Sequence, residues 1–204
     1  MPAQPHLILA SSSIYRRELL QRLQIDFSTH SPDIDEAPLL NESATQTAAR
    51  LARQKAEAVG LTKPGSVVIG SDQVATLDGE QIGKPGNHIA ALAQLKKMQG
   101  RQVFFHTALC VLDTRTEATT RLQQVIVDTT ALFRRLAEHQ LDAYLHIEQP
   151  YDVAGSAKNE ALGITLIESI TSTDPTALTG LPLIALTSML MHVGFEFFAE
   201  KTAS

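Results

Sequence analysis

The chain has 204 residues, of which 44% are hydrophobic and 19% charged, a composition typical of a soluble globular protein. A chain of this length buries about 70% of its unfolded surface, so it needs no disulfide to fold. Its single cysteine, Cys110, excludes an intramolecular disulfide and a cysteine-rich zinc site. The net charge of −5 argues against a protein whose main task is to bind duplex nucleic acid.

The sequence gives no sign of targeting to a membrane or of export. No basic segment precedes the first apolar stretch, which breaks at Ser11, so we expect no signal peptide. The most apolar run, residues 181–191, is too short to span a bilayer. We therefore expect a cytoplasmic protein with no membrane or nucleic-acid partner. The length of 204 residues predicts one domain over residues 1–204, or two lobes that share a core, and the lack of an internal repeat argues against a repeat architecture.

The first half of the chain predicts alternating strands and helices. Ser13 is a candidate N-cap for the first helix, and Ser43 with Gln46 forms a capping box for the second. In chain order we expect a strand at 6–10, a helix from about 14, a strand at 25–27, a loop at 31–39, a helix at 44–59, a connector at 60–66 and a strand at 67–70.

The second half predicts a pair of long strands between helices. Asp78-Gly79 is a hairpin signal, and Gly100 ends the helix that precedes the strand pair. The expected elements are a helix over about 89–98, strands at 103–112 and 122–129, a helix at 132–147, a strand at 163–170 and a helix at 183–191. Together the two halves predict an α/β fold, with a mixed sheet flanked by helices.

The junction between the first strand and helix carries Ser11-Ser-Ser-Ile-Tyr-Arg-Arg17. A helix N-terminus offers unpaired N–H groups and a partial positive charge, both suited to phosphate. Two arginines in the first turn oppose the helix dipole, and a bound polyphosphate would account for them. The alternative is a capped surface helix with two solvated arginines. From this segment alone both interpretations stay open.

Acidic residues stand at two places where they could hold a divalent cation. Asp33-Ile-Asp-Glu36 lies in the proline-bounded loop, where the alternative is a solvated acidic turn. Asp72, in Ser71-Asp72-Gln73, follows the strand expected at 67–70. Ligands gather beyond the carboxyl ends of strands in open α/β sheets, so Asp72 is a candidate for metal or water, although a turn role stays open.

The remaining polar residues are weaker signals. Gly83-Lys84-Pro85 is no P-loop, because the glycine spacing is wrong and a proline replaces the Ser/Thr magnesium ligand. Lys55 lies on the apolar face of the second helix, where snorkelling to solvent is the plain alternative to a functional role. The seven histidines show no HExxH motif or close ligand pair, and the spacing of His139 and His146 predicts surface positions.

Taken in order, these segments resemble the Maf-type nucleoside triphosphate pyrophosphatases. The resemblance covers essentially the whole chain, and its specificity comes from the order and spacing of blocks that are each weak alone. The blocks are Leu9–Arg17, Asp35-Glu36, Leu51–Ala56, Ile69–Gln73, Gly83–Pro85, Gly155, Gly163-Ile164 and Gly180–Leu183.

Within that family the chain looks most like the 7-methyl-GTP pyrophosphatase subgroup. The marks are the aromatic Tyr15 before the two arginines, Ser-Asp-Gln at 71–73, and Gly-Ser-Ala-Lys-Asn-Glu at 155–160. Two positions depart from the usual pattern: Ile14 stands where the family usually has proline, and Tyr15 where tryptophan is more typical of the subgroup.

The resemblance implies a two-lobed fold with a central nucleotide-binding cleft, a divalent metal (Mg, Mn or Co) and a homodimer. It also implies cleavage of a small-molecule nucleoside triphosphate between the α- and β-phosphates. The phosphates would be held by Ser11, Arg16, Arg17, Lys55 and Lys84. Glu36 and Asp72 would carry the metal, with Asp72 also the candidate base. Tyr15, Gln73 and Glu160 would read the nucleotide base.

Three functional hypotheses follow. The leading one is an enzyme that removes 7-methyl-GTP before it enters nucleic acid. The second is a dTTP/UTP pyrophosphatase of the same family. The third is a nucleotide-binding regulator of cell division and septum formation, a role that the resemblance also suggests. The presence of Asp72, Glu36 and Lys84 favours an enzyme, because a pure binder could dispense with a water-activating carboxylate.

Overall fold

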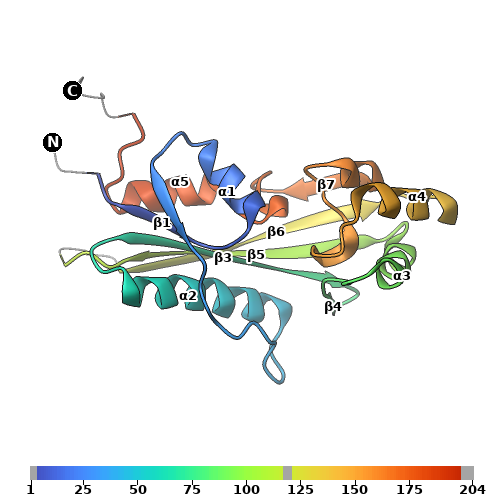
Figure 1. The fold of residues 1–204 in the computed structure, drawn as a ribbon, viewed down its shortest axis with the longest axis horizontal. Helices are drawn as coiled ribbons and strands as arrows, with labels where there is room; N and C mark the ends of the chain where they lie inside the picture. The colour runs from blue at the N-terminus through green and yellow to red at the C-terminus, as the bar shows by residue number, and fades with distance from the viewer. Residues whose placement is uncertain (1–3, 117–120, 199–204) are drawn as a thin grey trace.

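The computed structural model describes residues 4–116 and 121–198. Within them seven strands form one mixed sheet in the order β2-β1-β3-β5-β6-β7, with β4 paired to β3 off that path (Figure 1). The strands are β1 Leu7–Ala10, β2 Phe27–His30, β3 Val67–Leu77, β4 Glu80–Ile82, β5 Gln102–Asp113, β6 Leu122–Phe133 and β7 Ile167–Ser172. The α-helices are α1 Ile14–Gln21, α2 Ala44–Thr62, α3 His88–Met98, α4 Glu138–Glu148 and α5 Leu183–His192. The chain also forms short 3₁₀ turns, η1 Ala154–Ser156, η2 Leu162–Leu166 and η3 Ala177–Thr179.

The mixed α/β sheet expected from the sequence is confirmed. Strand β1 pairs in parallel with β2 and β3, whereas β3, β5, β6 and β7 pair antiparallel. Leu9 lies opposite Ile69, so β1 ends beside Gly70 while β3 continues. The chain leaving β1 therefore turns into α1 directly above the middle of β3, where a cavity can form.

At one end of the sheet, alternate side chains enter two separate cores. Leu7, Leu9 and Ile69 point to the face covered by α1 and α5. Ile8 and Val68 point to the opposite face, where they pack on the alanines of α2. Helices on both faces explain why the strand sequences here are continuously apolar. Figure 1 shows α2 on one side of the sheet and α1 with α5 on the other.

A third core fills the other end of the molecule. Helices α3 and α4 pack there with the turns that follow residue 150, around Leu95, Met98, Phe105, Leu141 and Leu145. The two ends share the long strands β3, β5 and β6, which run from one core to the other (Figure 1).

Helix α2 crosses β3 at Gly70 with almost no space between them. A Cβ at Gly70 would lie 2.2 Å from the Ala52 carbonyl oxygen and 2.9 Å from the Ala56 nitrogen. Only glycine permits this approach, because any side chain would meet helix backbone rather than a flexible side chain. The contact fixes the height of α2 above the sheet.

Strand β3 is longer than the sequence suggested. The expectation of a strand ending at residue 70 is wrong, because β3 continues to Leu77 and Asp72 lies inside it rather than beyond its end. Ser71, Asp72 and Gln73 stay in the sheet since each polar side chain finds a partner there. The hairpin at Asp78-Gly79 is confirmed, with φ of 52° and 84° at its two central residues.

Two later elements also differ from expectation. The helix expected at 132–147 begins only at Glu138, because Leu132 and Phe133 complete β6 and pair with β5 and β7. The strand expected at 163–170 is displaced to Ile167–Ser172, since residues 162–166 form the turn η2. The N-terminal Met1–Ala3 lie outside the described residues. In the described part of the chain no helix is long and apolar enough to cross a bilayer.

Replacing Gly70 tests the close approach of α2. Gly70→Ala should lower the free energy of unfolding by roughly 1–3 kcal/mol, because the new methyl group overlaps helix backbone and forces α2 to move. Gly83→Ala is the control, since a Cβ there has no neighbour within 4 Å. Urea unfolding of both variants gives the comparison; equal stabilities would contradict the packing described here.

Candidate active site

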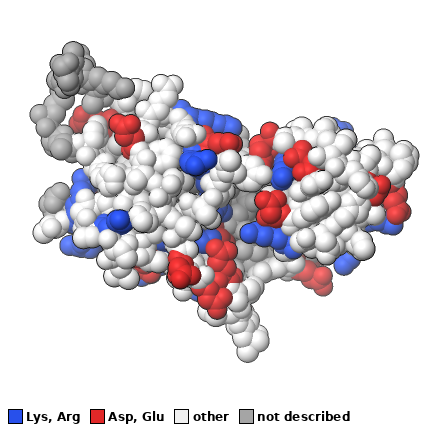
Figure 2. All heavy atoms as spheres, viewed as in Figure 1, with Lys and Arg blue, Asp and Glu red and all other residues white. Residues whose placement is uncertain are grey.

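A cavity of about 570 Å³ opens between the two ends of the molecule. Figure 2 shows it as a notch with both acidic and basic side chains along it. Its size suits a small organic ligand. The polar and charged lining residues include Ser11, Ser12, Ser13, Arg16, Glu36, Lys55, Asp72, Gln73, Lys84, Asp152 and Thr179. Most of the residues singled out in the sequence therefore come together here from distant segments.

The turn between β1 and α1 forms one wall. The Ser13 hydroxyl accepts from the Arg16 amide, which confirms Ser13 as the N-cap. The amides of Ile14 and Tyr15 have no acceptor within the helix, as at any helix start, and both residues line the cavity. The Arg16 Nε donates to the Gly180 carbonyl oxygen at 2.9 Å, so the guanidinium is held at the cavity rather than extended into solvent.

Lys55 occupies the centre of the site. Its Nζ lies 2.6 Å from Asp72 Oδ1 and 2.8 Å from Glu36 Oε1. The side chains of Lys55 and Asp72 are only 7% and 10% exposed, so this is a largely buried ion pair, not a lysine that snorkels to solvent. The geometry follows from the fold: Gly70 and Asp72 share one face of β3, and α2 approaches that face at Ala52 and Ala56.

The charges around Glu36 favour its ionised form. Partial burial raises the pKa of Glu36, but the hydrogen bond from Lys55 and the charges of Lys55, Lys84 and Arg16 outweigh it, so the pKa is lowered overall. Burial also lowers the pKa of the Arg16 guanidinium, which Asp72 and Glu36 oppose. The lining of the cavity thus combines three cations, Arg16, Lys55 and Lys84, with the carboxylates of Glu36, Asp72 and Asp152.

The loop that carries Glu36 is tied to α2 by a second ion pair. Arg50 donates from Nε and Nη2 to the two oxygens of Glu42, at 2.7 and 2.8 Å, and also to the Ala37 carbonyl oxygen at 3.0 Å. The bidentate ion pair with Arg50 lowers the pKa of Glu42 to about 2. Sequence reasoning missed both residues, although an Arg on α2 beside the acidic loop was a signal for them.

The donor set fits a divalent cation of the magnesium type. Two carboxylates meet at one ammonium, and Glu36 faces the open cavity with 55% of its side chain exposed. Hard cations prefer such oxygen ligands and complete their shells with water or phosphate oxygens. Among the described residues Glu36 and Asp72 are not joined by a third acidic or histidine ligand within one cluster, so a bound ion would use ligands from solvent or substrate.

Gln73 and Ser71 connect β3 to the segment 177–180. The Gln73 amide nitrogen donates to Thr107 Oγ1 and to the carbonyl oxygens of Ala177 and Leu178, at 2.8–3.1 Å. The Ser71 hydroxyl lies 2.9 Å from the Gly180 carbonyl oxygen, which also accepts from Arg16. Gly180 adopts a φ of 103°, which suits glycine and presents this carbonyl to both partners.

Tyr15, Gln73 and Glu160 border a smaller hollow of about 70 Å³ next to the main cavity. The two share Tyr15, Gln73 and Thr179 among their lining residues. Burial raises the pKa of Glu160, with a further increase from Glu148 and Glu18 and a decrease from Lys158. The residues expected to read the base thus lie together at one side of the site.

Three residues of the sequence motifs are not brought to the cavity. Arg17 is exposed on the outer side of α1, and Asp33 and Asp35 are exposed in the acidic loop. None of these three residues lines the cavity. Of the acidic residues in the loop at 33–36, Glu36 lines it. A role of Arg17 in phosphate binding stays a prediction.

The chain belongs to the Maf family: the model described as "Maf-like protein" matches residues 6–193. A 7-methyl-GTP pyrophosphatase from Ralstonia nicotianae is 61% identical over 196 residues, which cover 96% of this chain and all of the relative. Relatives of the same name from Cupriavidus metallidurans and Burkholderia orbicola are each 59% identical, over 96% of this chain and 96% and 93% of their own lengths. The resemblance seen in the sequence is confirmed.

Among solved structures, a HAM1 protein from Coxiella burnetii has a TM-score of 0.44 and 18% sequence identity to this chain. The match covers 65% of this chain and 74% of that one.

The ion pair at the centre of the site can be tested by stability. Lys55→Met should cost about 3 kcal/mol of unfolding free energy, because it leaves the Asp72 carboxylate largely buried without its partner. Lys55→Met/Asp72→Asn should recover part of that loss. Arg53→Met, which removes an exposed cation on the same helix paired with Glu57, should cost far less, because solvent screens that pair. Equal losses for the two single variants, measured by urea unfolding, would contradict the assignment.

Proposed function

We propose that the protein hydrolyses 7-methyl-GTP to 7-methyl-GMP and pyrophosphate and so keeps a modified nucleotide out of nucleic acid. The observation that carries the proposal is the buried Lys55–Asp72 pair, joined by Glu36, in a cavity that also holds Arg16 and Lys84. Relatives of this name are about 60% identical over nearly the whole chain, which supports the same choice of substrate.

The cations account for the phosphate end of such a substrate. A triphosphate carries roughly four negative charges, which Arg16, Lys55 and Lys84 offset in the ground state and as charge develops in the transition state. The residues at the start of α1, whose amides have no acceptor within the helix, line the same cavity and can add donors to the phosphates.

The carboxylates account for the chemistry. Glu36 and Asp72 would hold a divalent cation, which would shield the phosphates and lower the pKa of a bound water. Asp72 accepts the proton of the attacking water, whose oxygen bonds to the α-phosphorus as the bond to the bridging oxygen breaks and pyrophosphate leaves. Lys55 holds the Asp72 carboxylate toward the cavity for this step. A nucleotide-binding regulator would need neither a base nor a metal-activated water. The carboxylates of Glu36 and Asp72 therefore favour an enzyme.

The base end of the substrate is assigned to the smaller hollow. Methylation at N7 gives guanine a positive charge, which favours an aromatic face and a carboxylate over neutral partners. Tyr15 supplies the face, worth about 0.5–2 kcal/mol by cation–π attraction. Glu160 accepts from the guanine N1–H and amino group, worth about 1.5–3 kcal/mol. Because the Gln73 amide nitrogen is bound within the protein, Gln73 offers the base its carbonyl oxygen.

Further properties implied by the family stay proposals: a single domain over residues 1–204, a homodimer, and a cytoplasmic location. Sedimentation velocity of the purified protein tests the dimer directly. A purely monomeric species at micromolar concentration would overturn it.

The activity is tested with a nucleotide panel. Pyrophosphate release from 7-methyl-GTP, GTP, UTP and dTTP should be fastest for 7-methyl-GTP and should require Mg²⁺, Mn²⁺ or Co²⁺. A preference for UTP and dTTP would favour the second candidate of the same family, and binding without turnover would favour a regulator.

Asp72→Asn should remove most of this activity, by roughly 10²-fold or more, because the amide can neither take the water proton nor carry the metal as well. Asp33→Asn is the matched control, since Asp33 is exposed and does not line the cavity. Circular dichroism confirms that each variant is folded. Near wild-type turnover by folded Asp72→Asn would remove Asp72 from the mechanism.

Glu160→Gln tests base recognition, since it keeps the shape and removes the charge. kcat/KM should fall far more for 7-methyl-GTP than for UTP, whereas Glu168→Gln, an exposed control on β7, should change neither.

Because the pKa of Glu160 is raised, its charge is lost at a higher pH than that of an ordinary glutamate as the solution is acidified. The preference for 7-methyl-GTP over UTP should therefore shrink on acidification in the wild type and not in Glu160→Gln. If kcat/KM of Glu160→Gln falls equally for 7-methyl-GTP and UTP, Glu160 does not read the base.

A further inference from the structure

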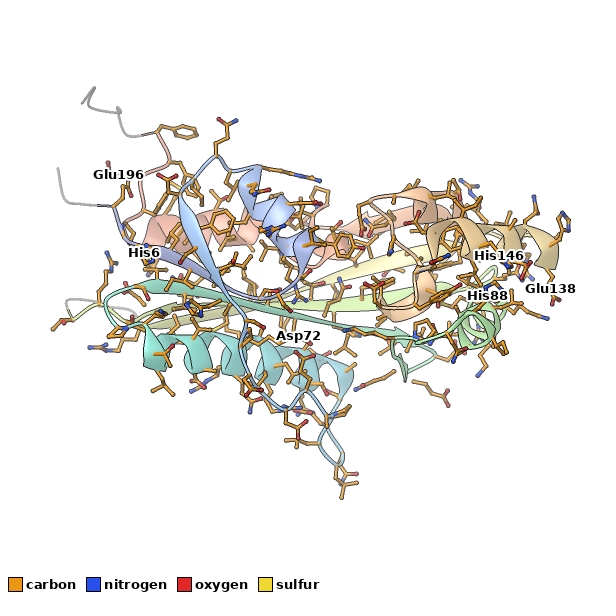
Figure 3. All side chains as sticks on the ribbon, in the orientation of Figure 1. His6, Asp72, His88, Glu138, His146 and Glu196 are labelled. Atoms are coloured by element: carbon orange, nitrogen blue, oxygen red, sulfur yellow. The ribbon has the colours of Figure 1, made fainter. Side chains whose placement is uncertain are left out.

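At the end of the molecule away from Asp72, two histidines from different helices face each other. His88 is the first residue of α3 and His146 lies near the end of α4 (Figure 3). Their ring centroids are 4.6 Å apart, and Asp142 lies one turn before His146 on α4. Each residue offers one ligand atom, and these atoms all lie within 4.8 Å of one another. The spacing of the histidines along the sequence could not reveal this cluster, because His88 and His146 come from different helices.

Hydrogen bonds anchor one nitrogen of each ring. His146 Nδ1 lies 2.9 Å from the Asp142 backbone carbonyl oxygen, and since that oxygen can only accept, Nδ1 carries the proton. Tyr151 donates its hydroxyl proton to the Leu145 carbonyl oxygen at 3.3 Å, so the same hydroxyl accepts from His88 Nδ1 at 3.1 Å. Each imidazole is thus anchored through Nδ1, and Nε2 is the nitrogen that can bind a metal once it carries no proton.

This arrangement brings His88 Nε2 within 2.8 Å of Asp142 Oδ1. At that distance a proton on Nε2 makes a hydrogen bond to the carboxylate, and a metal ion that replaces this proton would be bound by both groups. Two imidazole nitrogens and one carboxylate, each ring anchored through its other nitrogen, are the ligands and outer contacts of a transition-metal site. Imidazole ligands favour zinc over magnesium or calcium.

We propose that His88, Asp142 and His146 bind a Zn²⁺ ion, with solvent as the fourth ligand. The side chains of Asp142 and His146 are 45% and 69% exposed, which leaves the ion a route from solvent and an open position. The site lies outside the catalytic cavity and needs no nucleotide. It joins α3 to α4, which the Lys96–Glu138 ion pair also links at the surface.

The site also lies behind the segment that carries Lys84. His88 follows Lys84 by four residues, and the Gly86 amide donates to the carbonyl oxygen of Tyr151, the residue that holds the His88 ring. Zinc at this position therefore restrains the loop from its far side. Its role is structural, and it acts on the cavity only through that loop.

The test uses the full-length protein without a histidine tag, freed of metal by a chelator. The Glu36→Gln/Asp72→Asn background removes the carboxylates of the catalytic cavity, so that Zn²⁺ bound there is not counted. Titration calorimetry should then show one equivalent of Zn²⁺, and Zn²⁺ should raise Tm. Added Co²⁺ should give the visible absorption of a tetrahedral nitrogen and oxygen site.

In that background His88→Gln and His146→Gln should each abolish the binding and the rise in Tm. Tyr151→Phe should weaken zinc roughly tenfold, because it removes the hydroxyl that orients His88. His139→Gln, an exposed histidine on the same helix outside the cluster, should behave as the background does. Absence of Zn²⁺ binding, or equal binding in all these variants, would overturn the proposal and leave a protonated His88 paired with Asp142.

Discussion

The structure of the site depends on the approach of α2 to β3 at Gly70. Without a side chain at that position, the Ala52 carbonyl oxygen reaches the strand, and Lys55 is placed above Asp72. The Lys55 ammonium then compensates the charge of a largely buried carboxylate and draws Glu36 in from its loop. A buried pair of this kind contributes little to stability compared with an apolar contact of the same size. Its presence is better explained by the chemistry of the cavity.

The sequence predicted those elements whose local signals agree with their tertiary surroundings. The capping box at Ser43 and Gln46 begins α2, and Asp78-Gly79 forms the hairpin turn. It could not predict that β3 continues through Ser71-Asp72-Gln73, because the partners of these polar residues come from α2, β5 and the segment 177–180. Polar residues usually end a strand in sequence patterns, and only tertiary contacts reverse that expectation.

The residues that line the cavity were predictable from the sequence, but their arrangement was not. Order and spacing singled out Arg16, Lys55, Asp72 and Lys84, which all line the cavity, yet nothing local distinguished Arg16 from the adjacent Arg17. In the structure the two arginines differ because Arg16 donates to the Gly180 carbonyl oxygen, which holds its side chain at the cavity. The pairing of His88 with His146 could not be predicted from the sequence either. The two residues are 58 positions apart and are brought together by the packing of α3 on α4.

The most direct test of the central claim is a crystal structure with Mn²⁺ and an α,β-methylene analogue of 7-methyl-GTP, which cannot be cleaved between those phosphates. We expect anomalous scattering from manganese at Glu36 and Asp72, with the triphosphate chain beside Arg16, Lys55 and Lys84 and the base against Tyr15. Manganese away from both carboxylates, or a triphosphate bound outside this cavity, would contradict it.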